Sequence, residues 1–471
     1  MNCAIVWLRR DLRLEDNPAL DAAVRAHDRV ACVYIHAPDE EAPWQPGAAS
    51  RWWLHHCLTA LDADLRKRGA QLHIRCGPTQ QALDALIRET GAIAVYWGRA
   101  YEPRLLERDA HIKRTLRAAG VDAQSFNANL LIEPWQIATG QGGPYKVFTP
   151  FWRKLRAQLQ PRPPLPAPLR INSPAVPAGI DLDALKLLPQ IAWDAAFLQH
   201  WQPGEAGARE ALETFLAEPI IEYPGGRDRP DREWTSRLSA HLHFGEISPH
   251  QILWALEENA MNTRSATRDN AAEVFLRELG WRDFSHHLLF HFPTTPQQNL
   301  NAQFDRFAWA HDDADVLARW QRGQTGVPIV DAGRRQLWQT GWMHNRVRMI
   351  VASFLTKNLR LHWQHGARWF WDTLVDADLA NNTLGWQWVA GCGADAAPYF
   401  RVFNPVTQSK KFDPDGAYLR RWLPELADAP TTLLHEPWKD PTLLSRSSYP
   451  APMVDLATSR QDALAAYKHR G

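Results

Sequence analysis

Cysteine is scarce in this chain of 471 residues, and its five copies form no pattern that a disulfide framework or a structural zinc site requires. No two of them have the CxxC spacing, and an odd number leaves one without a partner. We therefore expect no metal site and a reducing compartment, which in a bacterium is the cytoplasm. The cysteines are Cys3, Cys32, Cys57, Cys76 and Cys392.

The sequence also lacks membrane and targeting signals. At the N-terminus, charge follows only a short apolar stretch, so the segment is typical of a first β-strand and not of a secretory signal. No apolar run reaches the length of a transmembrane helix. Neither a GxGxxG nor a P-loop motif stands at a strand-to-helix turn, which argues against a conventional dinucleotide or P-loop site.

Acidic residues are absent from one long segment of an otherwise neutral chain. The formal net charge is only +1, yet the segment from Arg334 to Trp371 holds seven Lys or Arg and no Asp or Glu. Such a concentration of positive charge is typical of a surface that contacts phosphates. The alternative is a basic amphipathic helix that simply faces solvent.

The length and the hydrophobic pattern predict two domains. Residues 1–130 alternate short β-rich runs with helical stretches, the pattern of a doubly wound parallel sheet in an α/β domain. Seven prolines in residues 161–177 indicate an extended connector, so we assign 131–203 to an interdomain linker. Residues 204–471 are predicted to form a larger, all-α domain. The strands are expected at 3–8, 30–35, 71–75, 93–97 and 121–126, and the helices of the first domain near 18–27, 49–68, 79–90 and 103–119.

Tryptophan is unusually common, with 23 copies against 17 phenylalanines and 9 tyrosines. Most are expected to be core residues. Trp281 belongs to a segment of the second domain that carries polar side chains at helical spacing. Glu278, Trp281 and Arg282 share one helix face, where the alternative is a surface ion pair beside a core tryptophan. The segment TSRLS, 235–239, follows a loop rich in glycine and proline, and its hydroxyls and amides suit a pyrophosphate or a plain helix cap.

Two further segments combine asparagines with charged residues. In WMHNRVRM, 342–349, Asn345 and Met349 lie one turn apart on a stripe that we expect to be buried, with Arg348 beside them and Arg346 projecting elsewhere.

In DADLANNTLGWQW, 376–388, Asp376 and Asp378 precede a helix start that we expect at Asn381 and Asn382, where carboxylates could serve as caps. Trp386 and Trp388 differ by about 200° around a helix and should face different partners.

Together these segments resemble the flavin-binding domain of the DNA photolyase and cryptochrome family, and the resemblance extends over essentially the whole chain. It is strongest for class I cyclobutane pyrimidine dimer photolyases of the bacterial type. The segments YKVFTPFWRKL, 145–155, at the domain junction, and DAAPYFRVFNPVTQSKKFDPDG, 395–416, a loop facing DNA, support it. The resemblance implies FAD, active in its reduced anionic form, as the cofactor of the helical domain.

The resemblance assigns cofactor-binding roles to residues of four segments. TSRLS holds the FAD diphosphate, Arg282 lies nearer the flavin, and Arg348 pairs with Asp376 beside the isoalloxazine. Asn382 faces flavin N5, a position that is Asn in photolyases, commonly Asp in plant cryptochromes and Cys in animal ones. The full FAD-binding set is Tyr223, Thr235, Ser236, Arg237, Leu238, Ser239, Arg282, Asn345, Arg348, Asp376, Asp378 and Asn382.

The resemblance also implies a lesion pocket. Glu278 hydrogen-bonds the damaged base, Trp281 and Trp388 form its aromatic walls, and Asn345 and Met349 contact the lesion. The related enzymes that act on (6-4) photoproducts carry histidines in place of Asn345 and Met349, so these two residues favour a cyclobutane dimer. Glu278, Asn345, Met349 and Asn382 form the expected catalytic set, and the expected DNA-binding set is Arg227, Glu278, Trp281, Asn345, Arg346, Met349, Trp388, Arg401 and Gln408.

An electron relay and an antenna complete what the resemblance implies. Trp386, Trp363 and Trp309 match the tryptophan chain that reduces photo-excited flavin. Positions of the family's folate pocket fall near Arg104, Leu105 and Gln297, which lack the expected side chains. Methenyltetrahydrofolate is the antenna that we expect, with a deazaflavin or no antenna as alternatives.

The expected function is therefore light-driven repair of cyclobutane pyrimidine dimers in DNA by a monomer that needs no protein partner and associates with the nucleoid during repair. A cryptochrome-like photoreceptor without repair activity is the main alternative. A flavin-free, nucleotide-binding scaffold with a DNA-binding helical half is the second alternative, and it leaves the tryptophan chain unexplained.

Overall fold

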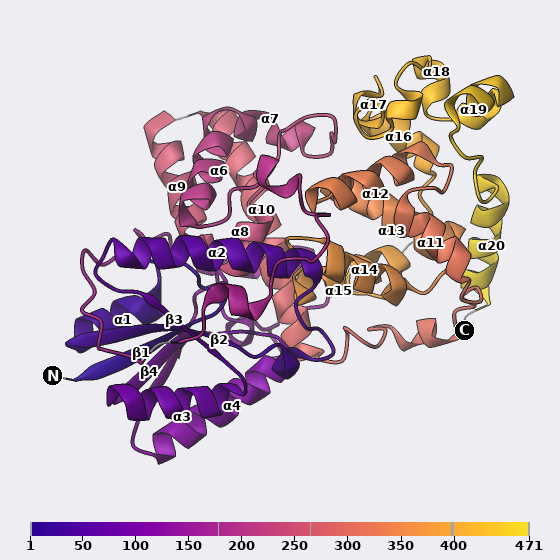
Figure 1. The fold of residues 1–471 in the computed structure, drawn as a ribbon. Helices are drawn as coiled ribbons and strands as arrows, with labels where there is room; N and C mark the ends of the chain where they lie inside the picture. The colour runs from indigo at the N-terminus through magenta and orange to yellow at the C-terminus, as the bar shows by residue number, and fades with distance from the viewer. Residues whose placement is uncertain (1, 178, 264, 397–399, 470–471) are drawn as a thin grey trace.

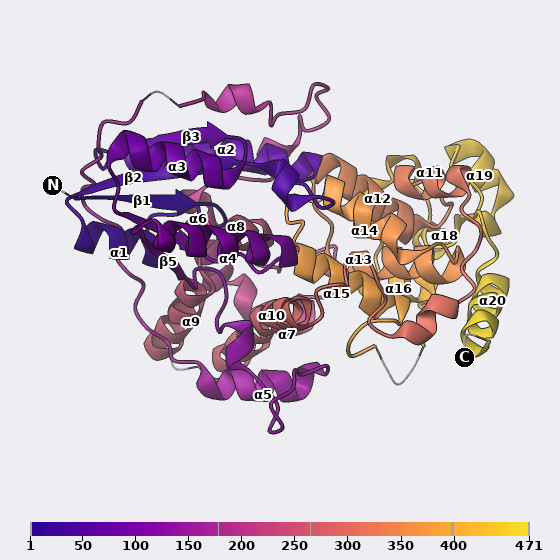
Figure 2. The same cartoon turned by 90° about the horizontal axis from the view of Figure 1, so that it is seen from below.

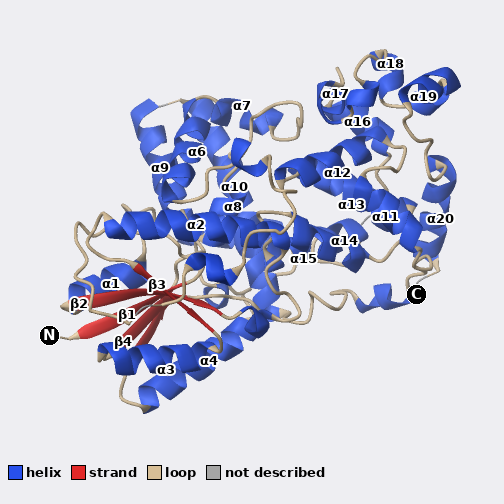
Figure 3. Ribbon diagram, viewed as in Figure 1, coloured by secondary structure: helices blue, strands red, loops and turns tan. Residues whose placement is uncertain are grey.

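The computed structural model describes residues 2–177, 179–263, 265–396 and 400–469. An α/β region holds every strand of the described chain, and helices make up the rest (Figure 3). In Figure 1 the α/β region is indigo and purple, and the helical region divides into a pink group, α6–α10, and an orange and yellow group, α11–α20. None of the described helices combines the length and apolar composition that a membrane crossing requires.

The sheet contains five parallel strands in the order β3-β2-β1-β4-β5. The central strand β1 reads CAIVWL and is buried throughout, as expected for a parallel strand that is covered on both faces. Its alternate residues Ala4 and Val6 pack toward α1 and α2, and Ile5 and Trp7 toward α3 and α4. The predicted doubly wound α/β domain is thus confirmed. Its elements are β1 Cys3–Leu8, α1 Pro18–Ala26, β2 Arg29–His36, α2 Ala48–Arg66, β3 Leu72–Cys76, α3 Thr79–Thr90, β4 Ala94–Gly98, α4 Pro103–Ala118 and β5 Asp122–Phe126.

The chain then crosses to the helical region through a segment with little regular structure. Helix α5, Phe148–Gln158, interrupts it and packs on α10 (Figure 2). Gly280 makes this approach possible, because a Cβ there would lie 2.4 Å from the Trp152 ring.

The helical region is nearly all-α, as predicted. Its helices are α6 Glu205–Ala217, α7 Pro219–Gly226, α8 Ser239–Phe244, α9 Pro249–Thr263, α10 Ala266–His291, α11 Ala314–Arg322, α12 Pro328–Thr340, α13 Asn345–Ser353, α14 Trp363–Thr373, α15 Leu379–Ala390, α16 Pro405–Phe412, α17 Ala417–Trp422, α18 Thr431–Leu434, α19 Pro441–Ser447 and α20 Leu456–Lys468. One π-helical turn, Phe354–Asn358, follows α13 directly.

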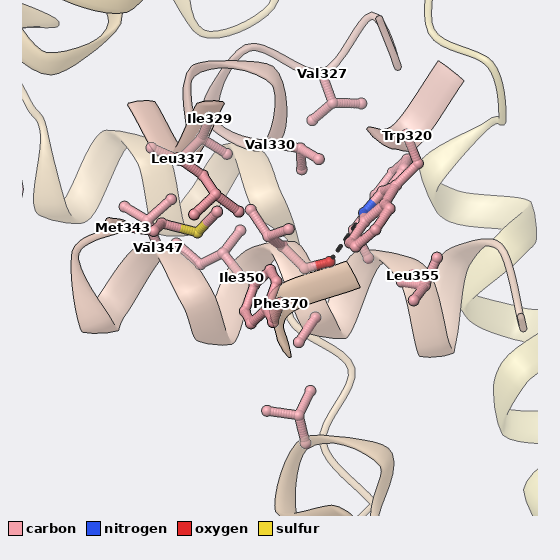
Figure 4. Packing of buried hydrophobic residues seen from close by; sticks show 14 of the residues in the cluster. Trp320, Val327, Ile329, Val330, Leu337, Met343, Val347, Ile350, Leu355 and Phe370 are labelled. Atoms are coloured by element: carbon pink, nitrogen blue, oxygen red, sulfur yellow. Dashed lines mark hydrogen bonds between the residues drawn. The ribbon is translucent and has the colours of Figure 1, made fainter. Parts of the chain in front are cut away.

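A dense apolar core fixes α11–α15 relative to one another. Figure 4 shows Trp320 inserted among residues of α12–α14, and its indole Nε1 donates to the carbonyl of Val351 over 3.4 Å. Met343 and Val347 pack in the same cluster, so the inner face of α13 is fixed by core packing and its outer face is left for polar side chains.

Buried polar contacts fasten the two regions together. The Trp53 indole on α2 donates to Glu246 over 2.9 Å, and the buried Arg13 donates to the carbonyl of Gly245 over 2.9 Å. One hydrophobic cluster includes residues of both regions, among them Ala4 and Trp342. The regions therefore share a core. Within the helical region, α10 and α15 pack against each other.

Candidate functional site

A cavity of about 580 Å³ opens in the helical region between the segment before α8 and helices α10, α13 and α15. Its volume lies within the roughly 300–1,000 Å³ of typical ligand sites. It brings together most of the site residues expected from the sequence. Those that border it are Tyr223, Arg227, Thr235, Ser236, Arg237, Leu238, Ser239, Glu278, Trp281, Arg282, Asn345, Arg346, Arg348, Met349, Asp376, Asp378, Asn382, Trp386 and Trp388.

The segment 235–239 places a buried cation in this cavity. Arg237 has φ +57°, a conformation rare for residues other than glycine. Its guanidinium lies between the rings of Trp201 and Trp342, 4.3 and 4.2 Å from their centroids. Burial lowers the pKa of Arg237 to about 10. A desolvated cation held by two aromatic rings is suited to an anionic ligand group.

Arg348 forms the expected ion pair with Asp376, with 2.8 Å between Nη2 and Oδ2. The second carboxylate oxygen of Asp376 is buried and has no hydrogen-bond partner in the described chain. Buried polar atoms are rarely left in that state, so a donor from a ligand would satisfy it.

Asp378 is the N-cap of α15 and accepts from the backbone amide of Asn381 over 2.8 Å. The helix therefore begins at Leu379, and the expected start at the Asn381–Asn382 pair is wrong, because the capping carboxylate lies earlier. His243 and His286 lie 3.6 and 3.5 Å from Asp378. Burial would raise the pKa of Asp378, but the two histidines outweigh it and hold the pKa well below its ordinary value.

On α10, Glu278 and Trp281 border the cavity together. The ring of Trp281 stacks on Phe148 of α5 at 3.7 Å and 11°. Arg227 donates to Glu278, and burial raises the pKa of Glu278 although the guanidinium opposes this. The sequence analysis missed Phe148 as the support of Trp281. It lies within YKVFTPFWRKL, so the signal was present.

The burial expected along α13 is only partly observed. Asn345 is exposed and Met349 half-buried, so the prediction of a buried stripe is wrong for Asn345, which lies in the first turn at the rim of the cavity. Arg346 was expected to project elsewhere, yet it also borders the cavity and pairs with Asp228 over 2.7 Å. Asp228 is a second residue that the sequence analysis missed.

Trp386 and Trp388 both border the cavity but contact different neighbours: Trp386 packs on Phe370, whereas the Trp388 indole donates to the carbonyl of Asp395. The cavity contacts residues on several sides of α15, so a separation of about 200° still allows both rings to reach it. Trp386 is buried against Phe370, with ring centroids 5.0 Å apart. The amide of Asn382 donates to the carbonyl of Ala367 over 2.9 Å.

The other two expected relay residues lie outside the cavity. Trp363 is buried, and its indole donates to Asn299 over 2.9 Å. Trp309 is half-buried and reaches Trp363 through the ring of His362, which lies 4.9 Å from Trp309 and 5.6 Å from Trp363. The aromatic contacts thus run from the buried Trp363 of α14 through His362 to the half-buried Trp309.

The remaining expected residues also lie outside the cavity. Arg401 is exposed, and Gln408 lies on α16. Residues 397–399 of the loop expected to face DNA lie outside the described residues. A second cavity, of about 70 Å³, lies where the α/β region meets the helical region. Of the three positions compared with a folate pocket, Leu105 borders this cavity, whereas Arg104 donates to Ala42 and Gln297 accepts from Gln364.

The donor set of the larger cavity fits FAD. A buried cation and backbone amides on segment 235–239 suit a diphosphate, and the unpartnered oxygen of Asp376 suits a ring or hydroxyl donor. The rings of Trp281 and Trp388 also border the cavity and suit a second, flat ligand.

Comparison with known proteins agrees with this chemistry. Residues 4–169 match the family model described as DNA photolyase, and residues 275–469 match the FAD binding domain of DNA photolyase. A deoxyribodipyrimidine photo-lyase of Agrobacterium fabrum is 46% identical, over 98% of this chain and 97% of that protein. The chain belongs to the DNA photolyase family and carries its FAD-binding domain.

Further relatives define the range of the family. Cryptochrome-1 of Arabidopsis thaliana is 39% identical over 96% of this chain but only 68% of its own length. A class III photolyase structure from Agrobacterium tumefaciens superposes with a TM-score of 0.95 at 45% identity, covering 100% of this chain and 98% of that one. An archaeal photolyase of Sulfolobus tokodaii, described with two FAD molecules, gives 0.83 at 30% identity, covering 99% of each chain.

Proposed function

We propose that this protein is a light-driven DNA-repair enzyme that splits cyclobutane pyrimidine dimers, a deoxyribodipyrimidine photo-lyase. One observation carries the proposal: a single cavity is bordered both by the FAD-type donor set and by Glu278, Trp281, Asn345 and Met349, the residues expected at a flipped lesion. A dimer is cheaper to flip out of the duplex than an intact pair of bases. The bacterial relative at 46% identity supports the same activity.

Some residues of the cavity bind the cofactor, and others bind the lesion. Arg237 and the amides around Ser236 bind the diphosphate, and Arg348 holds Asp376 toward the ring system. Photo-excited, reduced FAD supplies, when bound, the electron that breaks the two carbon–carbon bonds of the cyclobutane ring, and the electron then returns to it. Glu278 hydrogen-bonds the damaged base, while the rings of Trp281 and Trp388 orient it and exclude water.

We keep the cyclobutane dimer as the substrate on the basis of Asn345 and Met349. The sequence resemblance led us to expect class I. We now propose class III instead, because the photolyase structure of that class is similar over the whole chain.

Methenyltetrahydrofolate remains our proposal for an antenna. The second cavity, at about 70 Å³, is well below the roughly 300 Å³ of small ligand sites, so it does not enclose a folate as it stands. The two-FAD description of the archaeal relative makes a second flavin the rival. Chromophores released by denaturation separate the two, since a second flavin gives two FAD per chain and an antenna folate gives one FAD and one folate.

We also propose a cytoplasmic monomer that acts on duplex DNA without a protein partner and associates with the nucleoid during repair, with domains at 1–130 and 204–471 and a linker at 131–203. The five free cysteines and the bacterial relatives support the compartment. The positions of β5 and α6 support the boundaries.

The test is blue-light repair of an oligonucleotide with one defined thymine cyclobutane dimer by the dithionite-reduced protein. A dark control and a (6-4) lesion run alongside. Light-dependent restoration of the cyclobutane substrate alone is expected. The similarity to plant cryptochrome favours the photoreceptor as a second candidate, and a flavin-loaded protein that repairs neither lesion would support it, whereas Asn382 supports repair.

A further inference from the structure

Two neighbouring residues of one loop reach across the mouth of the cavity to different helices. Arg227 donates to Glu278 on α10. Asp228 accepts two hydrogen bonds from Arg346 on α13, 2.7 Å from Nη2 to Oδ2 and 3.2 Å from Nε to Oδ1. The loop that follows α7 therefore ties together two helices that border the site.

The Asp228–Arg346 pair differs from an ordinary surface ion pair. The Arg346 side chain is 17% exposed and that of Asp228 is 35% exposed. The guanidinium also lies 4.5 Å from the centre of the Phe412 ring, which restricts its orientation. Two-pronged, partly desolvated arginine–carboxylate pairs are stronger than the exposed pairs whose contribution is often negligible.

The pair shows that the positive charge of the basic segment 334–371 is partly neutralised within the fold. The fold compensates several of its charges with acids from elsewhere in the chain: Glu425 pairs with Arg335, Asp376 with Arg348 and Asp228 with Arg346. Asp376 is only 3% exposed, and Arg335 lies on α12, outside the cavity lining. Of these three acids, Asp228 alone faces an arginine at the mouth of the cavity.

We propose that Asp228 is an intramolecular competitor of DNA phosphate at Arg346, and thereby a residue that limits how tightly the protein holds DNA. The inference rests on the proposed function, in which Arg346 contacts the DNA backbone. A phosphate offers a guanidinium the same pair of acceptor oxygens as a carboxylate. Binding must exchange one anion for the other, and departure of the DNA restores the internal pair.

The consequence is weak binding of DNA that has no lesion. Every complex that uses Arg346 loses the same internal pair, whether the DNA is damaged or not. A flipped dimer recovers affinity through contacts inside the cavity, which undamaged or repaired DNA does not make. Asp228 therefore keeps the enzyme from being retained on intact duplex and favours release of the repaired product.

The test compares Asp228→Asn with Asp64→Asn, which removes the same charge from an exposed pair with Lys67 on the α/β region. Asparagine keeps the size of the side chain. We expect Asp228→Asn to bind undamaged duplex about three- to tenfold more tightly at low salt, which exceeds the effect of a typical exposed pair because this pair is partly buried and two-pronged. The plot of log affinity against log salt should become steeper by up to about one unit, because Arg346 is then free to neutralise a phosphate. Asp64→Asn should match the wild type.

A double-mutant cycle with Arg346→Ala separates competition from a general charge effect. Once Arg346 is gone, Asp228→Asn should tighten binding much less. Asp228→Ala serves as a second variant, and bound flavin per chain reports that each variant is folded. Tightening that persists without Arg346 would overturn the proposal, as would weaker or unchanged binding by Asp228→Asn, since these results would make Asp228 a residue that orients Arg346 or a bystander.

The inference and the proposed function fail in different ways. A wild-type protein that binds flavin but shows neither DNA binding nor repair would remove the function itself. A wild type that repairs dimers while Asp228→Asn behaves like Asp64→Asn would remove only the competitor role.

Discussion

Arg237 in the larger of the two cavities described above is held differently from the arginines that border the smaller one. In the cavity of about 70 Å³, Arg10 binds Glu102 and Glu41 over 2.5 and 3.3 Å, and Arg108 binds Glu40 over 2.9 Å. In the cavity of about 580 Å³, Arg237 is held by two indole rings. The two rings fix Arg237 without neutralising it, so its charge remains for a ligand, whereas carboxylates neutralise Arg10 and Arg108. Within the larger cavity, Arg346 and Arg348 are also paired with carboxylates, so Arg237 differs from them too.

The largest expected effect tests which cavity holds the flavin. Replacing Arg237 with Ala removes the buried cation, and a hydrogen bond to a charged group is worth about 1.5–3 kcal/mol, so FAD affinity should fall about 10- to 100-fold. The measurement is flavin absorbance per chain after dialysis.

Arg25→Ala, an exposed arginine on α1, is the matched control and should keep its flavin. Retention of a full complement by Arg237→Ala would show that the rings do not hold this cation for the cofactor.

The next effect concerns the aromatic contacts that lead away from the larger cavity. Trp386→Phe keeps a ring against Phe370 but removes an oxidisable indole. We expect blue light to leave the bound, oxidised flavin unreduced in this variant, while the dithionite-reduced protein still repairs dimers. Absorbance during illumination and a repair assay on the same sample measure both.

Trp320→Phe, which changes a second indole packed 6.3 Å from Trp386, serves as a comparison. Equal loss of photoreduction and repair in Trp386→Phe would contradict its assignment as a relay residue.

The same two cavities show what could be predicted from the sequence. Short β-rich runs between helical stretches predicted all five strands to within about two residues, because parallel strands buried on both faces give continuous apolar runs. Motif resemblance predicted most of the larger cavity's lining, since those side chains are set by helical spacing within short segments.

Contacts between distant segments could not be predicted in this way. Phe148 against Trp281 and Asp228 against Arg346 join residues more than a hundred positions apart, and the motifs that contain Phe148, Trp281 and Arg346 do not indicate which distant residue each one contacts. The predicted burial of Asn345 was wrong for a similar reason: helical spacing predicts which residues share a face, but not whether that face opens to a cavity. The start of α15 was placed two residues too late, at the Asn381–Asn382 pair, because Asp378 was not recognised as the residue that caps the helix directly before Leu379.

A smaller effect tests whether Glu278 contacts the lesion or the flavin in the larger cavity. Glu278→Gln keeps the shape of the side chain but removes the charge that Arg227 contacts. Repair by the reduced protein at limiting substrate should fall about tenfold or more, the loss of one charged hydrogen bond, while flavin content stays unchanged. Initial repair rates at low dimer concentration measure this.

Glu273→Gln on the same helix is the control, because Glu273 pairs with Arg156 at the surface. A loss of flavin from Glu278→Gln would place this carboxylate on the cofactor side of the cavity instead.

The last expected effect concerns the stability of the fold and not activity, and the residue that causes it, Asp283, lies on α10. Burial raises the pKa of Asp283 to about 7, far above its ordinary value, although the amide of Ile132 donates to it over 3.0 Å. The folded protein therefore binds a proton that the unfolded chain has already lost, so this group stabilises the fold below the ordinary pKa of an aspartate and loses that contribution as the pH rises to about 7. Within this window the free energy of unfolding should fall by at most about 1.4 kcal/mol per pH unit. Asp283→Asn should lack this dependence of the unfolding free energy on pH. Urea denaturation at several pH values measures it. An identical slope in both proteins would show that Asp283 is already ionised in the fold. Arg282, the neighbour of Asp283 in the chain, borders the larger cavity. A negative charge gained by Asp283 therefore also changes the electrostatic potential in that cavity. The arginines of the smaller cavity are already paired with carboxylates, so no such change with pH is expected there.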